Sequence, residues 1–222
     1  MGIDLPVIWA VIIGFGLMMY VVMDGFDLGI GILFPFIRDR GDRDIMVNTV
    51  APVWDGNETW LVLGGGGLMA AFPLAYAVLM PALYTPMIAM LLGLVFRGVA
   101  FEFRWRDARH RAFWDFAFTT GSIVAALAQG IVLGALLQGV KVTGRGYGGG
   151  WLDWLTPFSL LAGASVLSAY ALLGCTWLIA KTEGQAQRQA YRLARRYGII
   201  TLMAIAAVSA ATPFLDHDYY TR

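Results

Sequence analysis

The sequence predicts an all-α, polytopic membrane protein, a transmembrane helix bundle of about six spans. Of its 222 residues, 59% are hydrophobic and 14% are charged, whereas soluble domains are about 45–50% apolar and about 25% charged. The apolar residues form long unbroken runs rather than short alternating segments, which favours helices over a membrane β-barrel. Helices also pair their own backbone groups, as a bilayer requires.

The expected spans are six apolar runs of close to 20 residues or more, the length that crosses about 30 Å of hydrocarbon. They cover residues 6–34, 51–72, 75–96, 113–137, 156–180 and 197–213. We expect a single transmembrane domain over residues 1–222. Within it, residues 1–138 form a first four-helix bundle, and residues 139–222 begin a second, incomplete one.

Basic residues distinguish the two ends of this bundle. Thirteen of the 16 Lys and Arg residues lie in the connections between spans one and two, three and four, and five and six. The remaining three are Lys141, Arg145 and the terminal Arg222. By the positive-inside rule, the basic connections are cytoplasmic and the amino terminus is periplasmic. The net charge of +1 gives no indication of a nucleic-acid partner.

Two connecting segments have features of their own. Residues 139–150 are rich in glycine, which predicts a flexible outer loop, and Trp151 and Trp154 follow it as expected interfacial anchors. Residues 185–196 carry several arginines. They are interpreted either as a short basic amphipathic helix at the inner surface or as a solvated loop.

Acidic residues interrupt the first two spans. Asp24 and Asp27 are three positions apart and so share a helix face, and Asp55 and Glu58 have the same spacing in the second span. A short loop between antiparallel neighbours would place both pairs at similar depth in the cytoplasmic half. Arg97 follows the third apolar run and enters the same layer.

Charges inside a bilayer cost about 2.5–3.5 kcal/mol each on insertion scales. The layer must therefore pair its charges, take up protons or line a wet path, and a carboxylate between burial and a neighbouring arginine can carry protons. Glu102 lies a little beyond Arg97 and is expected to be a further acidic member. A buried pair of Asp27 and Arg97 that only fixes helix register is the structural alternative.

Ligands for a metal or haem are scarce. The two histidines, His110 and His217, lie outside the spans, whereas haem in a membrane bundle needs an axial His, Met or Cys. The methionines are expected to pack against other side chains rather than to bind haem. The single Cys175 excludes a Cys–Cys motif. No P-loop or His-Glu-x-x-His motif occurs. We therefore expect that this chain itself binds no cofactor or metal and has no catalytic residues.

Three motifs follow one another in the first half of the chain. They are DGFDLG at residues 24–29, APVWDGNETWL at residues 51–61 and FRGVAFE at residues 96–102. Together they resemble subunit II of the cytochrome bd-type terminal quinol oxidases, including the cyanide-insensitive branch. Shorter matches at residues 114–115, 137–139 and 156–163 extend the resemblance into spans four and five.

The resemblance implies a haem-free subunit of a quinol oxidase in the bacterial inner membrane. Such a chain pairs with a larger subunit I, which carries two b haems, one d haem and the quinol site, and a small single-span subunit is a further expected partner. The complex oxidises quinol and reduces dioxygen to water with cytoplasmic protons. Membrane lipid and quinone are the expected small-molecule partners.

By motif position, the resemblance also assigns roles to residues. Asp24 and Asp27 would lie at the cytoplasmic mouth of a proton path, and Asp55 would pass protons toward the partner. The same path would include Glu58. Trp54, Arg97 and Glu102 would support the subunit interface and the haem environment.

Members of the family are longer than this chain, so the ending at Arg222 is interpreted as a truncation. A proton-coupled secondary transporter is the alternative function, because it also places carboxylates inside the membrane. It predicts inverted repeats, and no clear repeat is seen. A purely structural assembly subunit without a proton role is a third possibility.

Overall fold

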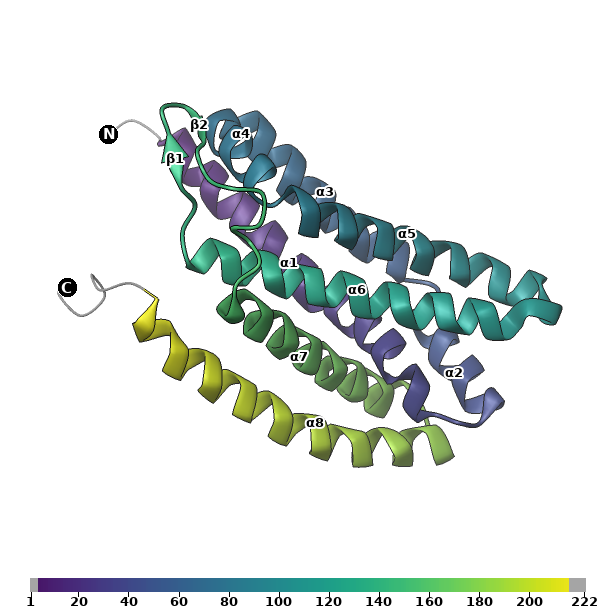
Figure 1. Cartoon of the computed structure of the whole chain (residues 1–222). Helices are drawn as coiled ribbons and strands as arrows, with labels where there is room; N and C mark the ends of the chain where they lie inside the picture. Colours follow the sequence, from purple (N-terminus) through teal and green to yellow (C-terminus); the bar gives the residue numbers. More distant parts are fainter. Residues whose placement is uncertain (1–3, 216–222) are drawn as a thin grey trace.

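A computed structural model of the protein describes residues 4–215 and consists almost entirely of helices. The long helices lie side by side in one elongated bundle (Figure 1). The helices are α1 (Leu5–Leu33), α2 (Arg40–Val50), α3 (Trp54–Ala71), α4 (Pro73–Ala82), α5 (Tyr84–Arg106), α6 (Arg111–Leu137), α7 (Pro157–Lys181) and α8 (Gly184–Ala211). Three 3-10 turns, η1 (Phe34–Phe36), η2 (Ala108–His110) and η3 (Thr212–Phe214), and two strands, β1 (Val142–Thr143) and β2 (Gly146–Tyr147), complete it. The all-α prediction is confirmed.

Helix α1 is the centre of the bundle. It packs against α3, α6 and α7, while α5 pairs with α6 and α8 packs chiefly on α7 (Figure 1). Helix α1 meets α7 backbone to backbone, because a Cβ on Gly174 would lie 2.6 Å from the carbonyl carbon of Gly29. Small residues at membrane helix crossings allow such close approach. The expected division at residue 138 stays a prediction.

Five helical segments within residues 4–215 are long and apolar enough to cross a membrane, one fewer than the six expected spans. They are Leu5–Phe36, Tyr84–Arg106, Ala108–Leu137, Pro157–Lys181 and Gly184–Phe214. The second expected span is helical as α3 (Trp54–Ala71) but is not among them. Its polar start, from Asp55 to Thr59, and its four consecutive glycines lower its hydropathy.

The third expected span, residues 75–96, is wrong as a single helix. The chain forms the short helix α4 and then α5, with a break at Leu83. Pro81 lies just before this break and Pro86 in the first turn of α5, and proline lacks the N–H that a continuous helix needs. Helix α5 also continues to Arg106, ten residues beyond the expected end, so Arg97 and Glu102 are helical.

The basic segment at residues 185–196 is helical rather than a loop. It forms the first half of α8, which is separated from α7 by two residues and continues without a break to Ala211. Gly184 starts the helix with φ of +69°, a conformation that glycine adopts readily. The side chains of Ala186, Ala190 and Leu193 are buried, so one face of this half of α8 packs against the rest of the bundle.

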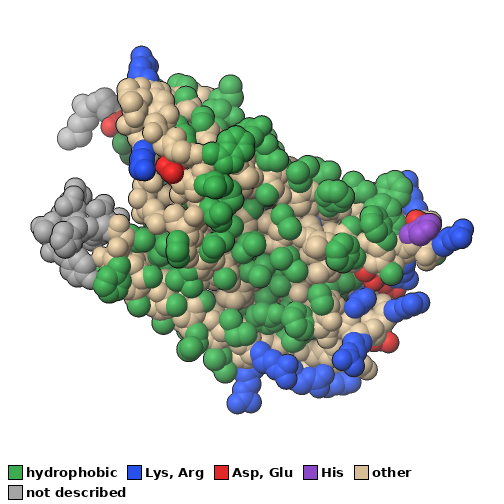
Figure 2. Space-filling model, viewed as in Figure 1, with side chains coloured by type: hydrophobic (Ala, Val, Ile, Leu, Met, Phe, Trp, Pro, Cys, Tyr) green, Lys and Arg blue, Asp and Glu red, His purple; other side chains and the backbone are tan. Residues whose placement is uncertain are grey.

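The two ends of the bundle differ in structure and in charge. One end carries α2 and the α5–α6 and α7–α8 turns, and Lys and Arg side chains gather there (Figures 1 and 2). The other end carries the antiparallel β1–β2 hairpin, which pairs Val142 with Tyr147 where a flexible loop was expected. Which end faces the cytoplasm stays a prediction, and His217 and Arg222 lie outside the described residues.

Candidate functional site

A fully buried arginine occupies the middle of the bundle. The side chain of Arg97 on α5 has no exposed surface, and its Nη1 donates to Glu58 Oε1 at 2.8 Å. The same Nη1 lies 3.9 Å from Asp24 Oδ1, which is too long for a hydrogen bond but close enough for strong attraction. Arg97 therefore joins α5 to α3 and α1.

Aromatic rings enclose this guanidinium. Its central carbon lies 5.1 Å from the ring centre of Phe101 and 5.9 Å from those of Trp54 and Phe118. Trp54 stacks on Phe101 with ring centres 4.8 Å apart, and a Cβ on Gly98 would touch Trp54 at 3.4 Å. Cation–π attraction of this kind is strongest where water is excluded. Trp54 and Arg97 thus lie together, and their expected support of the subunit interface and the haem environment stays a prediction.

Asp24 and Asp27 both lie on the buried face of α1 with no exposed surface. Asp27 Oδ2 accepts a hydrogen bond of 2.7 Å from Asn57 Nδ2, which also reaches the Met23 carbonyl at 3.4 Å. Within residues 4–215, several polar atoms of this layer lack a hydrogen-bond partner: both Asp24 oxygens, Asp27 Oδ1, and Arg97 Nε and Nη2. Such atoms are costly unless they exchange protons or meet further polar groups.

The charge of this layer is unbalanced. Three carboxylates, those of Asp24, Asp27 and Glu58, surround the one guanidinium of Arg97. A buried net negative charge is strongly unfavourable, so this arrangement favours the uptake of protons. The chemistry that these side chains support is reversible proton binding.

Asp55 lies one turn from Glu58 but on the surface of α3. The two carboxylates line a groove of about 460 Å³ between α3 and α5, together with Trp54, Leu94 and Gly98. The groove therefore connects the buried layer with the outside of the bundle through Glu58, whose side chain is 24% exposed.

Glu102 does not join the other acidic residues. Its side chain is 63% exposed and pairs with Arg106 at 3.6 Å along the same helix. The expectation that Glu102 joins the other four carboxylates is therefore wrong. The supporting role expected of Glu102 stays a prediction. Glu102 is close to Arg97 in sequence, but five positions rotate a side chain by about 140° around a helix.

Three neutral polar residues extend the layer and were missed in the sequence. Tyr170 on α7 donates to Gln129 Oε1 on α6, and Gln129 Nε2 donates to the Tyr20 hydroxyl on α1, both at 2.7 Å. Tyr20 lies one turn from Asp24. Single polar residues in apolar helices give little signal, and these three are far apart in sequence, so only the packing brings them together.

A second buried arginine, Arg104, has a different environment. Its Nε and Nη2 pair with Asp115 at 2.6 Å and Asp44 at 2.7 Å. Arg43 also pairs with Asp115, and Arg111 with Asp44. Burial raises the pKa of Asp44, but hydrogen bonds from Arg111 and Arg104 outweigh it and hold that pKa below its usual range. These five residues, the Arg104 clasp, join α2, α5 and α6.

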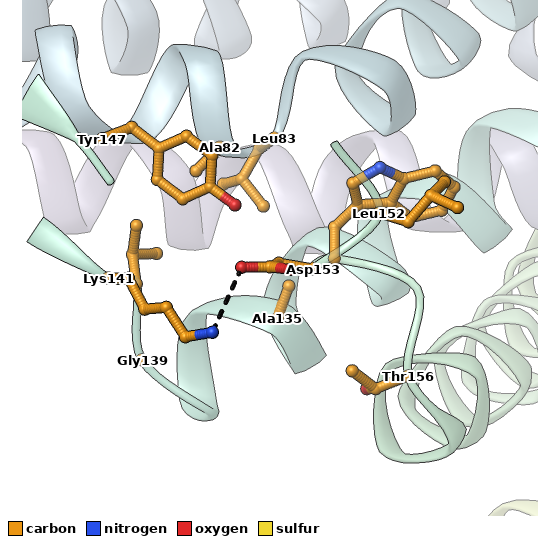
Figure 3. Close-up of a pocket in the computed structure, with 11 residues that line it drawn as sticks. Ala82, Leu83, Ala135, Gly139, Lys141, Tyr147, Leu152, Asp153 and Thr156 are labelled. Carbon is orange, nitrogen blue, oxygen red and sulfur yellow. Dashed lines mark ion pairs between the residues drawn. The ribbon is translucent and has the colours of Figure 1, made fainter. Parts of the chain in front are cut away.

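A pocket of about 380 Å³ lies at the hairpin end (Figure 3). Lys141 and Asp153 form an ion pair of 3.6 Å across it, beside Tyr147. The backbone N–H of Gly150 donates to Asp153 and holds the pKa of that carboxyl below its usual range. Because its charges are paired and exposed, this pocket is a weaker candidate than the Arg97 layer.

The side chains around Arg97 do not suit haem, which needs an axial His, Met or Cys. The one histidine in the described part of the chain is His110 of η2, whose side chain is 62% exposed and pairs with Asp107. No group of three or more His, Cys, Asp and Glu side chains within residues 4–215 is arranged to hold a metal ion.

Comparison with known proteins agrees with the resemblance. The family model of cytochrome bd terminal oxidase subunit II matches residues 5–220. Cytochrome bd-I ubiquinol oxidase subunit 2 of Escherichia coli K12 is 37% identical over 90% of this chain and 55% of its own length. A probable cytochrome oxidase subunit 2 of Haemophilus influenzae is 37% identical over 89% of this chain and 54% of its own length. Cytochrome bd ubiquinol oxidase subunit 2 of Bacillus subtilis is 28% identical over 97% of this chain and 64% of its own length.

The chain thus spans between about half and two thirds of the length of these curated relatives. Its apolar helices and its relatives make it a protein of the bacterial inner membrane. The matched residues 5–220 include all three motifs and the whole Arg97 layer. The chain belongs to the cytochrome bd terminal oxidase subunit II family.

Proposed function

We propose that this chain is the haem-free subunit of a terminal quinol oxidase, which couples quinol oxidation to the reduction of dioxygen to water. The family match and the names of the relatives support this function. A haem-bearing subunit I, with b and d haems, would be its partner, because the buried layer of this chain has proton-binding groups rather than haem ligands. The chain would stabilise that subunit and supply it with protons.

The observation that carries the proton path is the excess of buried carboxylates over the single Arg97. In the proposed path, protons enter from the basic, cytoplasmic end and reach Asp27 and Asp24 on α1. They then pass to Glu58 and to Asp55 on the surface of α3. Glu58 would act as the exchange point, because it touches Arg97 and also lines the open groove.

The same groove indicates where the partner would bind. A carboxylate on the lipid-facing side of a helix is costly, and Asp55 is exposed on α3. A partner that covers Asp55 and Glu58 would remove them from lipid and receive their protons. We therefore place the interface with subunit I on the α3–α5 face, with Trp54 at its edge.

The first test is the substitution Asp55→Asn in the oxidase assembled from this subunit and its haem-bearing partner. Slower quinol-driven oxygen uptake with a normal haem spectrum is expected, because the amide keeps the shape of the side chain but cannot carry a proton. Asp24→Asn should behave alike. Asp153→Asn, at the exposed outer pair, is the matched control and should leave both readouts unchanged.

Loss of the haem spectrum in Asp55→Asn would instead give this residue a structural role at the interface. Unchanged oxygen uptake in both variants would contradict the proton path. The carrier alternative predicts that this chain moves a solute without its partner, so activity in its absence would overturn the oxidase assignment. The family match favours the oxidase.

A further inference from the structure

A directional chain of hydrogen bonds crosses three helices next to the acidic layer. It runs from Tyr170 on α7 through Gln129 on α6 to Tyr20 on α1, with both links at 2.7 Å. The two tyrosines are each only 3% exposed. Tyr170 lies over Gly25, where a Cβ would approach its ring to 2.8 Å. A glycine on α1 thus leaves room for the ring that begins the chain.

The direction of the chain follows from the groups involved. The amide nitrogen of glutamine only donates and its oxygen only accepts. Gln129 Nε2 therefore occupies a lone pair of the Tyr20 oxygen, and the proton of the Tyr20 hydroxyl points elsewhere. The other side of the amide is fixed as well, because Gln129 Oε1 accepts from Tyr170.

Asp24 is the candidate acceptor for the proton of the Tyr20 hydroxyl. It lies four positions after Tyr20, on the same face of α1, and both Tyr20 and Gln129 are close to its carboxyl. The carboxyl is completely buried, and among the described residues neither of its oxygens has a hydrogen-bond partner. A Tyr20 hydroxyl proton directed at Asp24 would supply the hydrogen bond that this carboxyl lacks.

If the Gln129 amide group turns over, so that its nitrogen and oxygen exchange places, both hydrogen bonds of the chain reverse their direction. Gln129 Oε1 would then accept the Tyr20 proton and Nε2 would donate to Tyr170, which leaves the Tyr20 oxygen free to accept. A protonated Asp24 can donate to that oxygen, whereas an ionised Asp24 needs the proton of Tyr20. The two directions of the chain match the two protonation states of one carboxyl.

We propose that Gln129 is a positioning residue for Asp24: its amide, held between Tyr20 and Tyr170, takes one orientation for the ionised carboxyl and the reverse for the protonated one. No proton leaves either tyrosine in this exchange. The chain only turns, so Asp24 gains a hydrogen bond in both states. This inference deepens the proposed function and rests on it.

Other groups also act on Asp24 and must be kept constant in a test. Arg97 on α5 faces it at 3.9 Å, Glu58 on α3 and Asp27 on α1 are acidic neighbours, and Tyr170 on α7 also faces it. Gln129→Met changes none of these charges. It keeps the length of the side chain and removes both hydrogen bonds.

The experiment measures quinol-driven oxygen uptake against pH in the assembled oxidase with Gln129→Met. Infrared difference spectra of the carboxyl C=O band are recorded as well, the Asp24 band being the one that Asp24→Asn removes. We expect the pH midpoint assigned to Asp24 to move to higher pH by about one unit, because the hydrogen bond to the ionised carboxyl is stronger than the one to the protonated carboxyl by roughly that amount. The Asp24 band should also shift. Tyr170→Phe, which frees the amide on one side, should give a smaller shift in the same direction.

The matched control is Thr201→Val, which removes a buried polar contact of 3.5 Å between α8 and Ser168 on α7. It should change neither the pH midpoint nor the band. If Gln129→Met does not assemble, as judged by haem content, Tyr20→Phe takes its place and should give the same shift. Either variant with an unchanged midpoint and band would overturn the role of Gln129.

The two proposals fail in different ways. Normal oxygen uptake in both Asp24→Asn and Asp55→Asn would contradict the proton path, and with it the proposed function of the layer. Slow uptake in Asp24→Asn together with an unaltered Gln129→Met enzyme would leave the path intact and refute only the role of Gln129.

Discussion

Helix α5 places two buried arginines seven residues apart, on the same face, in opposite electrostatic environments. Arg104 pairs through Nε and Nη2 with two carboxylates that two further arginines share. Arg97 pairs within hydrogen-bond distance through Nη1 alone and faces three carboxylates. In the first site both carboxylates are paired and the pairs hold helices together, although Arg104 Nη1 is buried without a hydrogen-bond partner in the described residues. The second has five such atoms, on Asp24, Asp27 and Arg97, and this larger number, three of them carboxylate oxygens, favours proton exchange there.

The largest expected effect comes from breaking the Arg104 clasp. Arg104→Met should lower the free energy of unfolding by about 3–5 kcal/mol, because it leaves Asp44 and Asp115 with less compensation beside a buried methionine. Unfolding in detergent by heat or denaturant measures this loss. Arg106→Met, at a side chain that is 76% exposed, is the control and should have no measurable effect.

Arg97→Met sharpens the comparison between the two sites. It should cost less stability than Arg104→Met, since the carboxylates around Arg97 can take up protons once the guanidinium is gone. It should nevertheless abolish most of the oxygen uptake of the assembled enzyme. Equal losses of stability in the two variants would show that the sites do not differ in the way that their pairing indicates.

A smaller effect is expected from acid. The pKa of Asp44 is lower in the folded chain than the usual value of about 3.9, so Asp44 stabilises the clasp above that pH. The stabilisation is lost as the pH falls through the lower, folded pKa. The free energy of unfolding should therefore decrease below about pH 4. In Asp44→Asn this acid-dependent part should be absent, and an identical pH dependence in the variant would contradict the assignment.

The smallest effect is expected at the outer pocket. Lys141 and Asp153 pair at 3.6 Å with side chains that are 77% and 40% exposed, and exposed pairs contribute little. Lys141→Met should leave thermal unfolding and oxygen uptake unchanged. A clear loss of activity would mean that this pocket has a function that its open, fully paired geometry does not indicate.

Much of the bundle could be predicted because long apolar runs determine it, and α1, α6 and α7 begin and end within about two residues of their expected limits. Helix α2 was missed because four of its 11 residues are charged. It forms because Asp39 caps it and because Met46, Val47 and Val50 pack inside. The break at Leu83 was missed, although Pro81 and Pro86 on either side of it indicate that a helix is interrupted there.

The acidic layer could be predicted from spacing, and the structure brings Asp24, Asp27 and Glu58 to Arg97. Sequence distance misled at Glu102, where the helical rotation matters more than closeness. Asn57 stood inside a quoted motif, yet its bond to Asp27 is a tertiary fact. Gln129 and its two tyrosines had no local signal, since hydrogen bonds between helices depend on how those helices pack.

The contact between Gly29 and Gly174 gives the electrostatics of this layer a mechanical consequence. Side-chain contacts can adjust by changing rotamers, but two backbones in contact cannot. A displacement of α1 as Asp24 or Asp27 exchanges a proton would therefore push α7 as a rigid rod. Tyr170 is one turn away from Gly174 on that rod, so each protonation event would also move the first donor of the Gln129 chain.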